Sequence, residues 1–257
     1  MDKANTATSS KAPPTQLAHL TWPEVEAYLT RRTDVVVPIG STEQHGPTGP
    51  MGTDYLCADA VARAVGERTG VLVAPPLPVG MALHHMAFPG TLSLKPSTLI
   101  AVIVDVVLSL AEHGFRRVLF INGHGGNVPT LRSGFAEAHA GWRARGLAQS
   151  DPLQLDGLNW WEGPSAKALL AELFGRADGY HATASELSMV QHVVPATQRP
   201  APPDLPVPGA HGYQGAADFR AKHPDGRMGS DVRLADPAHG PRLIVAAVTD
   251  IAAKLAH

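Results

Sequence analysis

The sequence has little of several residue classes that mark other kinds of protein. It contains one cysteine, Cys57, among 257 residues, which excludes a disulfide framework within the chain and is compatible with a reducing cytoplasm. No stretch reaches the roughly 18 consecutive apolar residues of a membrane span. Its 21 Lys and Arg residues nearly balance 23 Asp and Glu residues, for a net charge of −2. This balance gives no electrostatic reason to expect nucleic acid or a membrane as a partner.

The remaining composition is that of a globular protein with one core. Hydrophobic residues make up 44% of the chain and charged residues 17%, so we expect a single domain over residues 17–257 and a cytoplasmic location. Residues 1–16 are polar, include Pro13 and Pro14, and lack an apolar segment. We therefore expect a flexible tail there and not a signal peptide. Cys57 falls on the apolar pattern of an expected helix, which indicates a packing thiol and not a nucleophile.

Short apolar runs alternate with longer segments of helical periodicity. The runs predict strands at residues 35–39, 71–74, 118–121 and 153–158. Helices are expected from a capping box at Thr21 and Glu24 to residue 30, and at residues 58–68, 96–113, 128–145 and 238–255. The Pro-rich stretch 199–208 is expected to be an ordered crossing or excursion on the surface. This rhythm predicts a single-domain, layered α/β/α fold with a mostly parallel central sheet.

Glu43, His45 and Asp54 follow the first predicted strand, in a segment rich in Gly and Pro. Glu43 and His45 are two residues apart, so in extended chain both side chains leave from the same side. A turn through the following loop can return Asp54 toward them. These ligand types suit Zn²⁺, Mn²⁺ or Fe²⁺ without choosing among them. The alternative for this segment alone is a polar loop with a hydrogen-bonded Glu and His.

A second polar cluster follows the strand predicted at 118–121. There the sequence reads Asn-Gly-His-Gly-Gly-Asn, from Asn122 to Asn127. Open α/β sheets place ligands outside the carboxyl ends of their strands, so both clusters should meet at one crevice, with His124 as a further metal ligand. A phosphate-binding loop is the competing interpretation. The segment lacks the Lys-Ser/Thr of a P-loop and the spacing of a dinucleotide fingerprint.

The third cluster runs from His181 to Glu186 at the start of a predicted helix. A cap near Ser185 would place Glu186 in the first turn beside the crevice, where it is both a metal-ligand and a proton-transfer candidate. His181 lies on the preceding loop and could act as a general acid or base, although an exposed loop histidine is the plainer interpretation.

Together the three clusters resemble the creatininase (creatinine amidohydrolase) family, from about Trp22 to the last helix. The motifs that carry the resemblance are Gly40 to Pro47 with Gly52 to Asp54, His85 to Ser93, Asn122 to Asn127, and His181 to Glu186. The resemblance implies a dinuclear centre of two divalent ions (Zn, Mn or Fe) and a homo-oligomer such as a hexamer. It also implies that Asp54 bridges the ions, that His181 sits over the substrate, and that the ligands are Glu43, His45, Asp54, His124 and Glu186.

Two departures from the family bear on the substrate. Creatininases carry Tyr and Glu after the second-motif histidine, where this chain has Gly125 and Gly126, so that one metal ligand of that subgroup is absent. Thr48 stands where the family has a histidine. Creatinine is therefore not the expected substrate. Three further residues are candidates for the substrate pocket: His85, Trp160 and Trp161. Since neighbouring residues of an extended chain face opposite ways, only one of His84 and His85 should reach a given metal.

These features predict a metal-dependent hydrolase that uses a dinuclear metal-activated water on a small cyclic or linear amide or a related carbonyl compound. Two alternatives remain open. One is a hydrolase or isomerase of a sugar-like cyclic ketone, such as an oxidised inositol. The other is a non-catalytic metal-binding scaffold, which metal analysis would distinguish.

Overall fold

A parallel four-stranded sheet forms the centre of the molecule in a computed structural model that describes residues 14–146 and 152–256. The strands are β1 (Asp34–Ile39), β2 (Leu72–Val73), β3 (Arg117–Asn122) and β4 (Gln154–Asn159), in the order β2-β1-β3-β4. Each pairing is parallel, and Ile39 of β1 lies opposite Asn122 of β3. The carboxyl ends of β1 and β3 therefore finish side by side.

The residues of β1 and β3 alternate between two apolar cores, as period-two side chains require. Val35, Val37 and Ile39 join Val118 and Phe120 in one core. Val36, Leu119 and Ile121 join the other. Because both faces of these strands are covered, the strands are almost entirely apolar.

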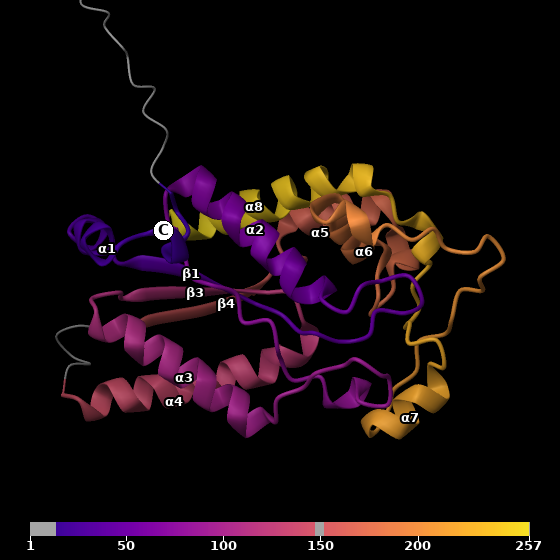
Figure 1. The fold of residues 1–257 in the computed structure, drawn as a ribbon, viewed down its shortest axis with the longest axis horizontal. Helices are drawn as coiled ribbons and strands as arrows, with labels where there is room; N and C mark the ends of the chain where they lie inside the picture. Colours follow the sequence, from indigo (N-terminus) through magenta and orange to yellow (C-terminus); the bar gives the residue numbers. More distant parts are fainter. Residues whose placement is uncertain (1–13, 147–151, 257) are drawn as a thin grey trace, which may run out of the picture.

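Helices cover the two faces as separate layers (Figure 1). One layer contains α3 (Pro96–Glu112) and α4 (Val128–Ala144). The other contains α2 (Thr53–Thr69), α5 (Pro164–Leu173), α6 (Ala184–Val193) and α8 (Gly240–Leu255). The short helix α1 (Trp22–Leu29) adds Tyr28 to the first core, and α7 (Gly215–Lys222) packs against the turn Leu83–His85. The layered α/β/α prediction is confirmed, and the sheet is parallel throughout.

Helix α2 begins five residues earlier than the sequence predicts, at Thr53 instead of residue 58. Gly40 and Gly123, which directly follow β1 and β3, allow this start. A Cβ on Gly40 would lie 2.3 Å from Tyr55 N, and one on Gly123 would lie 2.1 Å from Asp54 O. The glycines let the first turn of α2 touch the chain directly after both strands, and that contact places Asp54 beside the two strand ends.

Other predicted elements match with small shifts, and two helices were missed. The capping box of α1 is present, with Glu24 Oε2 accepting from Thr21 N at 2.7 Å. The sequence analysis did not predict α5 or α7. Residues 14–16, assigned to the flexible tail, instead run beside β2, where Val73 N donates to Thr15 O at 2.8 Å. The rest of that predicted tail lies outside the described residues.

The stretch 199–208 is free of helix and strand, and Arg227 Nη2 donates to Pro206 O in it at 2.7 Å. Within residues 14–146 and 152–256, no helix combines the length and apolar character needed to cross a bilayer.

Candidate metal centre

The predicted metal ligands come together at the carboxyl end of the sheet. Glu43 and His45 follow β1, His124 follows β3, and Asp54 and Glu186 lie in the first turns of α2 and α6. The side chains of Glu43, His45, Asp54 and His124 are buried. Five ionisable groups in one buried site need compensating charge or ligands, because an uncompensated buried charge is costly.

Glu43, Asp54 and His124 form a first group of converging ligand atoms. His124 Nε2 lies 3.0 Å from Met81 O, to which it can only donate, so a neutral ring has its lone pair on Nδ1. That Nδ1 lies 3.2 Å from Glu43 Oε1 and 3.1 Å from Asp54 Oδ2. Among the described residues, neither oxygen has a hydrogen-bond partner. With a neutral His124 ring, three lone pairs would point at one another, so this group needs either a proton on Nδ1 or a metal ion between the three atoms.

His45, Asp54 and Glu186 form a second group. His45 Nδ1 lies 3.1 Å from the Glu43 carbonyl oxygen, and its Nε2 lies 2.9 Å from Asp54 Oδ1. Glu186 occupies position N3 of a capping box, where its Oε2 accepts from Thr183 N at 2.9 Å and from Thr183 Oγ1 at 2.8 Å. Both contacts use Oε2, which leaves Oε1 for an ion. Asp54 thus belongs to both groups, with one oxygen facing each.

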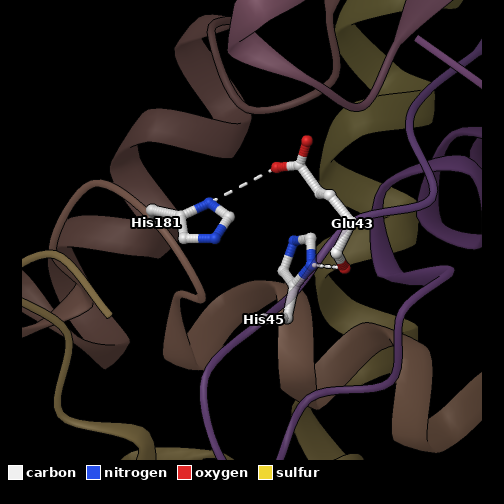
Figure 2. Close-up of side chains that lie close together, drawn as sticks. All are labelled: Glu43, His45 and His181. Atoms are coloured by element: carbon white, nitrogen blue, oxygen red, sulfur yellow. Dashed lines mark hydrogen bonds and ion pairs between the residues drawn. The ribbon is translucent and has the colours of Figure 1, made fainter. Parts of the chain in front are cut away.

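His181 approaches the same centre from the loop before α6. Figure 2 shows its ring directed toward Glu43 and His45, with Nδ1 3.7 Å from Glu43 Oε1. Its Nε2 donates to the Gln44 carbonyl oxygen at 2.8 Å, so a neutral ring again has its lone pair on Nδ1. Ligand atoms of Glu43, His45 and His181 lie within 4.8 Å of one another. Geometry therefore permits His181 to bind either a proton or an ion.

The pKa values of these groups show how strongly the site favours positive charge. Burial disfavours the charged form of His45, yet Asp54 raises the pKa of His45 to about 10. Burial also opposes charge on His124, but Glu43 and Asp54 raise the pKa of its imidazole well above the usual range. Burial raises the pKa of Glu186 to about 7. In the absence of a metal, protons on the imidazoles neutralise the carboxylates. Divalent ions would displace those protons.

The donor set fits divalent transition metals. Imidazole nitrogens and carboxylate oxygens are the ligands of Zn²⁺, Mn²⁺ and Fe²⁺ sites, and each imidazole of the two groups donates its other N–H to a backbone carbonyl. That second contact orients a metal-binding histidine. A dinuclear arrangement is available because Asp54 offers one oxygen to each group.

A cavity of about 740 Å³ opens beside these ligands. Asp54, His124, His181 and Glu186 line it, and Trp160 and Trp161 form part of its wall. Within the part of the chain that the structure describes, its lining contains no lysine or arginine. Gly125 also lines the cavity, and a Cβ built there would meet nothing within 4 Å. The cavity therefore has free space beside Gly125 that a larger side chain at this position would occupy.

His84 and His85 differ from their predicted arrangement. They lie in a 3₁₀ turn and not in extended chain, so their rings lie together, with centroids 4.1 Å apart. Both line the cavity, but His85 is buried and its Nε2 lies 3.3 Å from Glu43 Oε1. His85 therefore lines the pocket, as expected, and also contacts a candidate metal ligand. The sequence analysis also missed Gln44, which contacts both His85 and His181.

The motifs and most of the chain match known proteins. The family model for creatinine amidohydrolase (creatininase) matches residues 18–255. A mycofactocin precursor peptide peptidase from Mycobacterium ulcerans is 36% identical over 165 residues, 59% of this chain and 59% of that protein. A creatinine amidohydrolase from Pseudomonas putida is 33% identical over 164 residues, 62% of each chain. A 3-dehydro-scyllo-inosose hydrolase from Thermotoga maritima is 35% identical over 107 residues, 41% of this chain and 34% of that protein. The chain thus matches less than two thirds of the length of these relatives.

Solved structures are similar over nearly the whole chain. A mutant creatininase complexed with creatine has a TM-score of 0.83 at 27% identity and covers 95% of this chain and 98% of its own. Two other creatininase structures, described as an Mn form and a mutant of Zn-Zn type, each have a TM-score of 0.78 at 26% identity with the same coverage.

Proposed function

Since the chain belongs to the creatininase family, we propose that it is a metal-dependent hydrolase that cleaves the C–N bond of an amide at a dinuclear centre. The observation that carries the proposal is the convergence of unpartnered acceptors around Asp54. Glu43 Oε1 and Asp54 Oδ2 face the Nδ1 of His124 in a buried site, and neither oxygen has a hydrogen-bond partner among the described residues. Such an arrangement suits a divalent ion, which would replace the proton that the His124 ring otherwise carries.

Two ions would be held by overlapping ligand groups. Glu43, Asp54 and His124 would bind one ion, and His45, Asp54 and Glu186 the other. Zn²⁺ and Mn²⁺ are the leading candidates, because related creatininase structures are described with these metals. When bound, such ions act as Lewis acids that lower the pKa of water and polarise a carbonyl group.

His181 and Glu186 would transfer protons during the reaction as general base and general acid. Burial and the neighbouring His45 lower the pKa of His181 well below its ordinary value, so its ring is neutral and Nδ1 carries a lone pair. Its Nε2 remains held by the Gln44 carbonyl, which keeps Nδ1 directed at the centre. Nδ1 would take a proton from the attacking water and pass it to the departing nitrogen. Glu186 lines the same cavity and offers a second carboxylate for that transfer.

The cavity favours an uncharged or cationic substrate larger than creatinine. With no lysine or arginine in its described lining, it offers no side chain to hold a phosphate or an extended polyanion. Trp160 and Trp161 supply apolar wall, and the open space at Gly125 admits bulk beside the ligands. A linear peptide amide fits these properties, which agrees with the name of one relative, a peptide peptidase. We expect the active form to be a homo-oligomer.

A second candidate substrate is a cyclic ketone. One relative is an inosose hydrolase, and a polarised ketone carbonyl would use the same ligands and the same proton acceptor at His181. A metal-binding scaffold without activity is less favoured, because the five candidate ligands converge on one site in overlapping groups.

The test is hydrolysis by the purified full-length chain, stripped of metal and reloaded with Mn²⁺ or Zn²⁺. Peptides, lactams, formamides and a cyclic polyol ketone are each incubated with it, and products are identified by mass spectrometry through the gain of one water. We expect turnover of an amide that stops on chelation and returns on reloading. Turnover that persists under chelation, or that is confined to the ketone, would contradict the proposal.

A further inference from the structure

We propose that Gln44 and His85 form a positioning pair that holds the Glu43 carboxylate ready for metal binding. The inference rests on the metal centre of the proposed function. Gln44 lies between the ligands Glu43 and His45 in the sequence, and both Gln44 and His85 are buried. The pair would act through Glu43 without itself binding an ion.

Two backbone groups of opposite character fix the orientation of the Gln44 amide. Its Oε1 accepts from Gly46 N at 2.9 Å, and its Nε2 donates to the Gly226 carbonyl oxygen at 3.0 Å. If the amide were flipped, its NH₂ group would face the Gly46 N–H and its oxygen would face the Gly226 carbonyl oxygen. Only one orientation satisfies both neighbours, so the position of the NH₂ group follows from the contacts.

The amide in turn fixes the tautomer of His85. Gln44 Nε2 lies 2.9 Å from His85 Nδ1 and 2.9 Å from His181 Nε2. His181 Nε2 already donates to the backbone carbonyl oxygen of Gln44 at 2.8 Å, so it cannot also accept from the Gln44 side chain. The second amide hydrogen therefore goes to His85 Nδ1, which must be the unprotonated nitrogen. The ring proton of a neutral His85 then resides on Nε2.

The nitrogen that carries this proton lies close to the metal ligand Glu43. His85 Nε2 lies 3.3 Å from Glu43 Oε1, the same oxygen that lies 3.2 Å from His124 Nδ1. Ser41 Oγ donates to the other oxygen, Oε2, at 2.9 Å. The Ser41 hydroxyl on Oε2 and the His85 N–H close to Oε1 favour the ionised form of the Glu43 carboxylate and limit its rotation. In the opposite tautomer, His85 would present a lone pair to Glu43 and repel it.

The chain around residue 226 is shaped to receive the amide. Gly226 has φ +90°, and a Cβ built there would lie 1.8 Å from Gln44 Oε1. Any side chain at this position would displace the amide from both of its backbone partners. The close approach indicates that the backbone at Gly226 is shaped around the Gln44 amide. A residue that merely filled space would not need such a close fit.

The experiment compares the same substitution at two equally buried glutamines. Gln44 and Gln191 are each 5% exposed, and Gln191 lies in α6 outside the ligand groups. The full-length Gln44→Met and Gln191→Met variants are stripped of metal and titrated with Mn²⁺ or Zn²⁺ against a chromophoric chelator. We expect Gln44→Met to weaken binding by about 10- to 100-fold, as for other outer contacts of metal ligands. Gln191→Met should bind like the wild type.

A double-mutant cycle and a spectrum separate positioning from general destabilisation. His85→Ala should weaken binding as Gln44→Met does, and the double variant should be no weaker than His85→Ala, because the two residues act in series. In the wild type, ¹⁵N chemical shifts should show His85 protonated on Nε2. This spectrum needs no variant, so it tests the inference even if Gln44→Met does not fold.

The outcomes distinguish this inference from the proposed function. Equal metal affinity of Gln44→Met and Gln191→Met, additive losses in the double variant, or a proton on His85 Nδ1 would overturn the positioning role alone. A wild-type chain that binds neither Mn²⁺ nor Zn²⁺ would overturn the metal centre and, with it, the positioning pair.

Discussion

The two ends of the central sheet both carry charged residues, but these residues are hydrogen-bonded by the chain at one end and left with unpartnered oxygens at the other. At the amino end, Asp34 accepts from Arg32 at 2.7 Å and lies 3.1 Å from the Tyr28 hydroxyl. Arg117 there donates to the carbonyls of Lys254 and Leu255, which end α8. At the carboxyl end, the carboxylates of Glu43 and Asp54 each keep an oxygen that has no hydrogen-bond partner among the described residues.

The contrast teaches how to separate a structural ion pair from a ligand site. At the amino end, groups of the chain itself complete the hydrogen bonds of the charged side chains, so no further ligand is needed. At the carboxyl end the acceptors exceed the donors, and the imbalance is buried. Binding of a metal ion offsets the desolvation penalty of such buried carboxylates. The following predictions test that difference.

The largest effect is expected from Asp54→Asn, because Asp54 belongs to both ligand groups. The substitution keeps the shape and removes the charge. Metal affinity should fall by more than about 100-fold, beyond the range for outer contacts, and turnover should fall with it. The matched control is Asp34→Asn at the other end of β1, which should keep the metal and lose about 1–3 kcal/mol of unfolding free energy. Equal metal content in the two variants would break the comparison.

A more selective effect is expected from Glu186→Gln. Glutamine can replace glutamate in a capping box, so α6 should remain folded while one ion loses one of its two carboxylate ligands and keeps only Asp54. Metal analysis should show one ion retained per chain, held by Glu43, Asp54 and His124. Glu24→Gln makes the same change in the capping box of α1 and should leave the metal content unaltered. Loss of both ions in Glu186→Gln would mean that the groups are not separable.

The smallest effect, on selectivity alone, is expected from Gly125→Tyr. The new side chain would enter open space in the cavity, so the KM for bulky amides should rise on the order of 10-fold while small amides are less affected. Metal content should stay unchanged. Gly212 is exposed and also has open space around its Cβ position, which makes Gly212→Tyr a suitable control. A loss of metal in Gly125→Tyr would instead assign this loop to the centre itself.

Much of this arrangement was predictable because it depends on local order in the sequence. Apolar runs that end in Gly-rich polar segments located β1 and β3, and parallel strands then place Glu43 and His124 at one edge. Glu186 followed from its capping position. The start of α2 was missed because the Gly- and Pro-rich segment before Asp54 looks like a loop, whereas the glycines after β1 and β3 allow the helix to begin against them.

Contacts between distant segments were not predictable. The 3₁₀ turn at His84 and His85 depends on packing against α7, which the sequence analysis did not detect. Gln44 has its partners at residues 85, 181 and 226, far along the chain. No local periodicity reports such contacts, so a glutamine between two ligands looked like an ordinary loop residue.

The most direct test of the central claim is anomalous diffraction from crystals of the full-length chain grown with Mn²⁺ or Zn²⁺. We predict two anomalous peaks that both contact Asp54, one also contacting Glu43 and His124 and the other His45 and Glu186. Absence of anomalous scattering at Asp54, in crystals of protein that is active without metal, would contradict the account.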